Sequence, residues 1–95
     1  MIARVTTFQA KPDRIPEVEA ALDGIRAQLG SVPGLLTSYS VWDESGSGVT
    51  FTVYEDAAAA EAALPAIQSV WAGLADHMAA APEARAFTTV EKLVG

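Results

Sequence analysis

The sequence contains no cysteine, one histidine and only six basic residues among its 95. Without cysteine there is no disulfide scaffold, thiolate zinc site, iron–sulfur cluster or cysteine nucleophile. Twelve acidic residues give a net charge of −6. So few lysines and arginines argue against a protein that binds the phosphate backbone of nucleic acids. The protein is therefore small and acidic, and any chemistry it performs has to use side chains other than cysteine.

Long hydrophobic runs are also missing. No stretch reaches the roughly 20 apolar residues that a membrane-spanning helix needs. The hydrophobic fraction of 51% is raised by alanine runs at 57–60 and 79–81, which favour helix rather than membrane. The first residues lack the basic region and apolar core of a signal peptide. We therefore expect a cytoplasmic protein, folded as one domain over 1–95, with no membrane and no nucleic acid partner.

The N-terminal third predicts a strand followed by a helix. Residues 2–9 alternate in polarity and carry β-branched side chains, which indicates a strand. The next apolar residues recur at spacings of three and four, which predicts a helix with Asp13 as N-cap and Gly30 just past its end. These residues are Ile15, Val18, Leu22, Ile25 and Leu29.

A hairpin is predicted in the middle of the chain. Residues 35–42 and 49–54 alternate, and a polar, glycine-containing loop joins them. Asp56 is the expected N-cap of the alanine-rich helix that follows.

Pro65 should kink or break that second helix, whose apolar spacing continues to about Ala81. Residues 87–94 alternate again and predict a last strand. The order is therefore β-α-β-β-α-β. It is typical of a ferredoxin-like α+β fold with an antiparallel four-stranded sheet and two helices on one face.

The faces of this sheet carry almost no charge. On the hairpin, one set of side chains is apolar (Leu35, Tyr39, Val41, Val49, Phe51 and Val53), and the other is hydroxyl-rich with Leu36, Trp42 and Tyr54. A solvated face normally alternates with charged residues, and a free apolar face would be a large patch for a monomer. We therefore predict a homodimer that pairs through its sheet faces. The alternative is a monomer with a hydroxyl-coated open face.

Three segments resemble the dimeric α/β-barrel superfamily, and within it the antibiotic biosynthesis monooxygenase (ABM)-like domains. They are the Lys11-Pro12 entry to the first helix, the turn at 32–35, and the run at 51–56 that leads into the alanine-rich helix. The resemblance covers nearly the whole chain. It implies the fold above, and it allows two activities: oxidation of polyphenols without metal or flavin, and haem degradation.

Two departures from the family are visible. Tyr54 stands where relatives often have tryptophan, and the middle of the second helix has alanines, Leu64 and Pro65 where they often have histidine. Haem-degrading relatives use an asparagine on the first strand. This strand offers Thr6 and Thr7, and the chain contains no asparagine. Of the two activities that the resemblance allows, haem degradation is therefore favoured less than the oxidation of polyphenols.

His77 is the only histidine, and it lies at the edge of the second helix's apolar stripe. An imidazole can act as a base near neutral pH, although a histidine near a helix end is also commonly structural. Trp71 and Trp42 can stack on a planar ligand or fill the core. Arg4 can pair with Glu91 on the last strand, the interpretation we favour, or meet an anionic group of a ligand.

We weigh two functions. The first is a cofactor-independent monooxygenase acting on a small aromatic or polyketide-like substrate, with His77 as base, Trp71 and Tyr54 lining the pocket and Thr6 as a polar contact. The second is a non-catalytic dimeric ligand-binding or structural domain. An apolar cavity of a few hundred Å³ reached by His77 would favour the first, and a filled interior the second. No spacing of His, Asp or Glu suggests a metal site.

Overall fold

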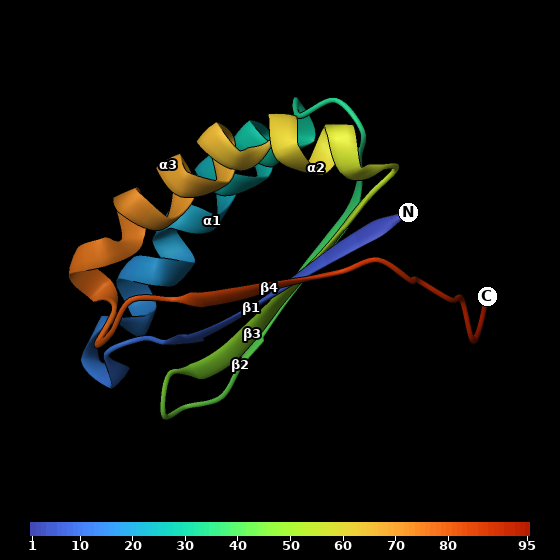
Figure 1. Cartoon of the computed structure of the whole chain (residues 1–95). Helices are drawn as coiled ribbons and strands as arrows, with labels where there is room; N and C mark the ends of the chain where they lie inside the picture. Colours follow the sequence, from blue (N-terminus) through green and yellow to red (C-terminus); the bar gives the residue numbers. More distant parts are fainter.

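Figure 1 shows the computed structural model, which describes all residues Met1–Gly95. The elements in order are β1 (Ile2–Gln9), the 3₁₀ turn η1 (Pro12–Arg14), α1 (Ile15–Gly30), β2 (Leu35–Trp42), β3 (Ser47–Tyr54), α2 (Ala57–Ala62), α3 (Leu64–Leu74), the 3₁₀ turn η2 (Ala75–His77) and β4 (Glu83–Phe87). The strands form one antiparallel sheet in the order β2-β3-β1-β4. All helices lie on the same side of it (Figure 1). The predicted ferredoxin-like fold is confirmed.

The register of the sheet decides which face meets the helices. Arg4 and Thr6 of β1 lie opposite Thr52 and Thr50 of β3, which in turn lie opposite Ser38 and Ser40 of β2. Phe8, on the same face of β1 as Thr6, packs against Val18 of α1 and Leu74 of α3, so this hydroxyl-rich set is the face under the helices. The alternative of a hydroxyl-coated open face is therefore wrong.

The open face is apolar except along β4, where Arg85 pairs with Val5 and lies over the Phe87 ring at 4.9 Å, and Glu83 pairs with Thr7. Tyr39 and Val41 of β2 are 71% and 64% exposed, and Phe51 and Phe87 are 39% and 38% exposed. We call these four residues, together with Val5 and Val49 between them, the open sheet face. Only 13 of 95 residues are buried, because the helices cover a single face of the sheet.

The hydrophobic core is divided into two clusters. One joins Phe8, Ala10, Val18, Leu74 and Met78 where β1 meets α1 and the end of α3. The other joins Tyr54, Ala60 and Ala63 where β3 leads into α2. Each cluster holds a helix against one end of the sheet, and the middle of the sheet between them carries the short Ser and Thr side chains.

Two of the four expected helix signals act as predicted; Gly30, expected just past the end of α1, is instead its last residue. Asp56 caps α2, since its carboxylate accepts a hydrogen bond from Ala59 N–H at 2.8 Å. Pro65 separates α2 from α3, where its missing N–H falls in the first turn. Asp13, in contrast, is not the N-cap of α1. It lies inside η1, and Arg14 takes the cap position without a side-chain hydrogen bond.

The C-terminal third ends its elements earlier than expected. The last helix stops at Leu74 rather than near Ala81, because the chain turns back through η2 to pair Met78 with Ala10. The last strand is β4 rather than 87–94. Since Phe87 already pairs with Ala3 near the start of β1, later residues have no partner strand to continue the ladder.

Glu91 consequently lies outside the sheet, and it makes no ion pair with Arg4; the only ion pair joins Arg26 to Asp23. The favoured Arg4–Glu91 interpretation is wrong. None of the helices combines the length and the apolarity that crossing a bilayer requires.

A cavity between the helices and the sheet

The hydroxyl-rich middle of the sheet is the floor of a cavity of about 620 Å³. α1 and α3 form its roof with apolar side chains, among them Leu22, Ile25, Val70 and Trp71. The cavity exists because the two core clusters hold the helices at its ends, while serine and threonine are too short to fill the space between. Exposed Arg26 and Leu36 line it as well, so it reaches the surface between α1 and β2.

The hydroxyls of the floor are arranged in cross-strand pairs. Ser38 and Thr52 are hydrogen-bonded at 2.8 Å, and Ser40 and Thr50 at 3.0 Å. The part-buried Ser38–Thr52 bond satisfies polar groups that the helices remove from water, whereas the Ser40–Thr50 pair is exposed. Thr6 of β1 lies beside Thr50 of β3, and the Thr6 hydroxyl forms no side-chain hydrogen bond. Thr6 is among the residues that line the cavity, and its role as a polar contact for a ligand stays a prediction.

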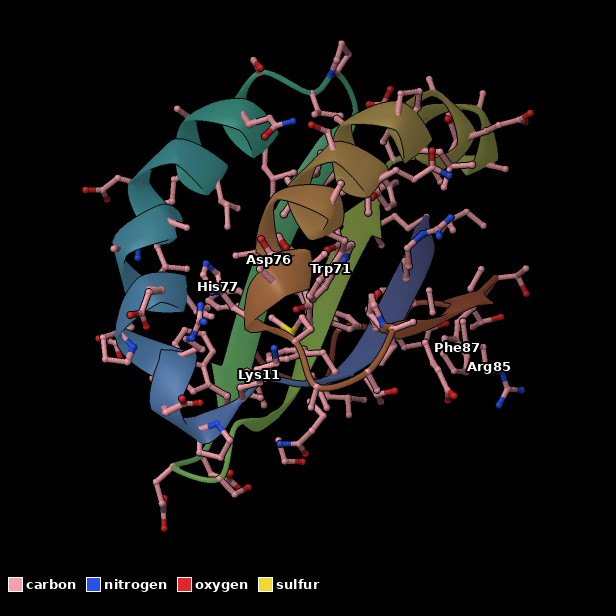
Figure 2. The ribbon with its side chains drawn as sticks, turned by 90° about the vertical axis from the view of Figure 1, so that its left-hand side faces the viewer. Lys11, Trp71, Asp76, His77, Arg85 and Phe87 are labelled. Carbon is pink, nitrogen blue, oxygen red and sulfur yellow. The ribbon has the colours of Figure 1, made fainter.

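Aromatic side chains line one end of the cavity. Trp71 extends from α3 toward the sheet (Figure 2) and packs on Phe8, with ring centroids 5.5 Å apart. Trp42 at the end of β2 lines the same end. A side chain at Gly48 would collide with the Phe8 ring, so the glycine leaves room for this aromatic group. Such walls suit a flat, apolar ligand.

A second cavity, of about 260 Å³, adjoins the first on the side of β4. Arg4, Thr6, Ile67 and Trp71 line both cavities and so form the wall between them. Arg4 is the only charged side chain in this wall. Trp71 and Thr6, two of the residues predicted for the site, are thus brought together here.

Tyr54 is placed differently. It is fully buried in the second core cluster and is not among the residues that line either cavity. Its hydroxyl has no hydrogen-bond partner. Burial raises the pKa of the Tyr54 phenol, and the positive charge of Arg4 partly opposes the rise. Whether Tyr54 contacts a ligand stays a prediction.

His77 lies on η2, next to α1 (Figure 2), and is not among the cavity-lining residues. Its Nδ1 accepts a hydrogen bond from the Arg14 guanidinium at 3.2 Å, because an arginine can only donate. Lys11 holds the same turn, since its N–H donates to the His77 carbonyl and its Nζ to the Asp76 carbonyl. The role of His77 as base stays a prediction.

The Ser38–Thr52 and Ser40–Thr50 pairs were not singled out from the sequence. The alternation marked a hydroxyl-rich face, but only the packing shows that this face lies beneath the helices. Arg4, an isolated charge in a strand, was the one available signal for a ligand-facing group. No three His, Asp or Glu side chains lie close enough together to hold a metal ion.

A ferredoxin-like sheet with a cavity under its helices defines a class of small α+β proteins. Within this class, residues 1–87 match the family described as antibiotic biosynthesis monooxygenase. The chain belongs to that family, which confirms the resemblance drawn from its segments. No curated protein matches the chain.

Several solved structures share the fold. A mutant of SnoaB, a cofactor-independent oxygenase from Streptomyces nogalater, superposes with a TM-score of 0.76 at 21% identity over 97% of this chain and 95% of that one. Rv0793 from Mycobacterium tuberculosis gives a TM-score of 0.76 at 16% identity, covering 98% of each chain. NE2512 from Nitrosomonas europaea, a protein of unknown function, gives 0.78 at 19% identity over 99% and 94%. At these identities the likeness shows the fold alone.

Proposed function

We propose that the chain is a cofactor-independent monooxygenase that oxidises a small, electron-rich aromatic substrate. The observation that carries this proposal is the cavity of about 620 Å³ beneath the helices, with aromatic walls and a hydroxyl floor, in a chain of the antibiotic biosynthesis monooxygenase family. Its volume suits a compact ligand of a few rings.

The reaction can be balanced without a bound redox group. A phenol-activated CH₂ group loses a proton to a base, and the resulting carbanion passes one electron to O₂. The substrate radical and superoxide combine to a hydroperoxide, which loses water to leave a C=O group. Overall, CH₂ and O₂ give C=O and H₂O, and the substrate supplies all the electrons. The protein excludes competing water, orients the aromatic ring of the substrate and stabilises the substrate anion.

The test is oxygen consumption with metal-free protein. After dialysis against a chelator, the protein should consume one O₂ per molecule of a polyphenol with an activated CH₂ group, and the product should carry one atom from ¹⁸O₂. Ser40→Phe, which obstructs the cavity at an exposed floor position, should abolish the uptake. Ser69→Phe on the exposed side of α3 is the matched control and should leave it unchanged. Equal uptake in both variants would place any reaction outside the cavity.

The second function is a non-catalytic ligand-binding domain of the same fold. One observation favours it: no carboxylate or imidazole is among the cavity-lining residues, so the lining supplies no base. In this case the protein would bind polyphenols tightly in the cavity, and oxygen uptake would not exceed that of the substrate alone.

We also propose that two copies pair through the open sheet face. The exposure of Tyr39, Val41, Phe51 and Phe87 on one side of the sheet supports this pairing, because a contiguous apolar face is costly to leave in water. Light scattering after size exclusion should give twice the chain mass of 9.9 kDa. A monomer at micromolar concentration would refute the pairing.

A further inference from the structure

Arg4 stands in an unusual electrostatic position. It lies in β1, one of the two central strands, between Thr52 of β3 and Ala86 of β4, and it is partly buried. The guanidinium hydrogen bonds in the protein are those of Arg14 and Arg26. Arg4 has neither a hydrogen bond nor an ion pair, although it lines both cavities.

No acidic side chain faces Arg4 across either cavity. The chain has twelve Asp and Glu residues, yet none is among the lining residues. The other charged lining residue, Arg26, is exposed at the cavity mouth and is already paired with Asp23 at 2.9 Å. A net charge of −6 repels anions from the surface as a whole. The wall between the two cavities is therefore a local positive site in an acidic protein.

An unpaired guanidinium in such a place retains its capacity to bind an anion. The neighbouring Thr6 and Thr52 hydroxyls can solvate it but cannot neutralise it. Its charge acts on the interior, since it opposes the rise in the pKa of the buried Tyr54 phenol. A carboxylate or phenolate meeting Arg4 would replace lost hydration with charge-assisted hydrogen bonds, which are about twice as strong as neutral ones.

The surroundings of Arg4 define the rest of the ligand. Trp71 and Ile67 share the wall with Arg4, so an aromatic ring packed on Trp71 brings its substituents to the guanidinium. We propose that Arg4 is a specificity-determining residue that selects planar aromatic ligands bearing an oxygen anion, a carboxylate or an ionised phenol. This inference rests on the proposed function in one respect, that the cavity is the substrate site.

The test compares two probes of nearly equal shape, 2-naphthoate and its neutral isostere 2-naphthamide. Binding is followed by quenching of tryptophan fluorescence, since Trp71 and Trp42 both line the cavity. We expect the wild-type protein to bind naphthoate about tenfold or more tightly than naphthamide. An acidic naphthol ionised at the assay pH, compared with its methyl ether, distinguishes a phenolate from a carboxylate as the preferred group.

Variants locate the preference. Arg4→Gln should bring naphthoate down to the affinity of naphthamide and change naphthamide by less than about twofold. Arg4→Lys, which keeps the charge, should retain part of the preference and guards against a folding defect. Arg85→Gln removes the same charge from the neighbouring strand on the opposite sheet face and should have no effect.

The outcomes separate the two proposals. Equal binding of both probes to the wild-type protein, or a preference that survives Arg4→Gln, overturns the role of Arg4 and leaves the cavity as the site. If neither probe binds at millimolar concentration, the proposed function fails together with the inference.

Discussion

The two faces of the sheet are built from different side chains. Toward the helices, the middle of the sheet presents paired hydroxyls and an unpaired arginine beneath a cavity of about 620 Å³. Away from the helices, the same strands present Tyr39, Val41 and Phe51 to the surface. In most small domains the apolar face is turned inward and the polar face outward. Here the arrangement is reversed over the centre of the sheet.

This reversal changes how tightly the two faces of the sheet are packed. The covered face loses packing, because short hydroxyl side chains leave space that larger apolar groups would fill. The core is consequently reduced to the two small clusters at the ends of the helices. A dimer through the open sheet face would bury the missing apolar area. Under the proposed pairing, a second copy would supply part of the core of this 95-residue chain while the cavity stays open.

The largest effect is expected from a charge placed on the open sheet face. Val41→Asp should convert the dimer to monomer, because each unpaired charge buried at an interface costs about 3–5 kcal/mol and the two-fold symmetry introduces it twice. Ala20→Asp on the exposed side of α1 is the matched control and should remain dimeric. Light scattering after size exclusion distinguishes them. A dimer that survives Val41→Asp would show that the face is not the interface.

The next largest effect concerns the base. If His77 acts as predicted, His77→Ala should lower turnover of an identified substrate by about 100-fold or more, and added imidazole should restore part of it. The control is Arg14→Gln, which removes the hydrogen bond to Nδ1 and leaves the ring in place. Unchanged turnover in His77→Ala would remove the assignment and leave a substrate that enters already ionised.

A smaller effect tests the hydroxyl floor. Thr52→Val keeps the volume but deprives Ser38 of its partner, and it should lower the free energy of unfolding by about 1 kcal/mol. Combining it with Ser38→Ala should cost less than the sum of the single changes, because the pair is lost only once. Thr37→Val, on the opposite face of β2 and without a side-chain hydrogen bond, should stay within about 0.5 kcal/mol of wild type. Urea unfolding measures the wild type and all four variants, and additive effects would contradict the pairing.

The smallest expected effect distinguishes two tyrosines. Tyr54→Phe removes a buried hydroxyl without a partner and should raise the free energy of unfolding by about 1 kcal/mol. Tyr39→Phe removes an exposed hydroxyl and should change nothing. A loss of stability in Tyr54→Phe would show that the hydroxyl is hydrogen-bonded in solution.

The contribution of Tyr54 to stability should also depend on pH. Because burial raises the pKa of Tyr54 above its usual value of 10.0, the unfolded chain loses this proton at lower pH than the folded one. The stabilisation of the neutral phenol is complete below pH 10 and is lost as the pH rises toward the folded pKa. Above pH 10 the wild type should therefore lose stability faster than Tyr54→Phe, as urea unfolding at a series of pH values would measure.

The sequence was sufficient for the elements that depend on local patterns. Alternation predicted the strands at 2–9 and 35–42, helical spacing predicted α1, and Asp56 and Pro65 marked the limits of α2. The wrong expectations concern positions where tertiary contacts decide. Alanine-rich residues after Leu74 have high helix propensity, but pairing of Met78 with Ala10 ends the helix. The alternation at 87–94 gives no strand because β1 offers no further partner.

The candidate site was predictable only in part. Thr6 and Trp71, named for a polar and an aromatic side chain, line the cavity, whereas Tyr54 and His77 lie outside its lining. Periodicity specifies that side chains share a face of a strand or helix. It does not specify how far each reaches or which other element it meets.

The order of the elements and the existence of two unlike faces on the hairpin follow from local sequence patterns, because periods of 2 and 3.6 residues are local properties of the backbone. The tertiary structure decided which face lies under the helices and left Arg4 without Glu91. Long-range packing determines which face of the sheet lies under the helices. Phe8 and Tyr54 anchor the helices at opposite ends of the sheet, and the face that carries both, hydroxyls included, has to turn inward with them.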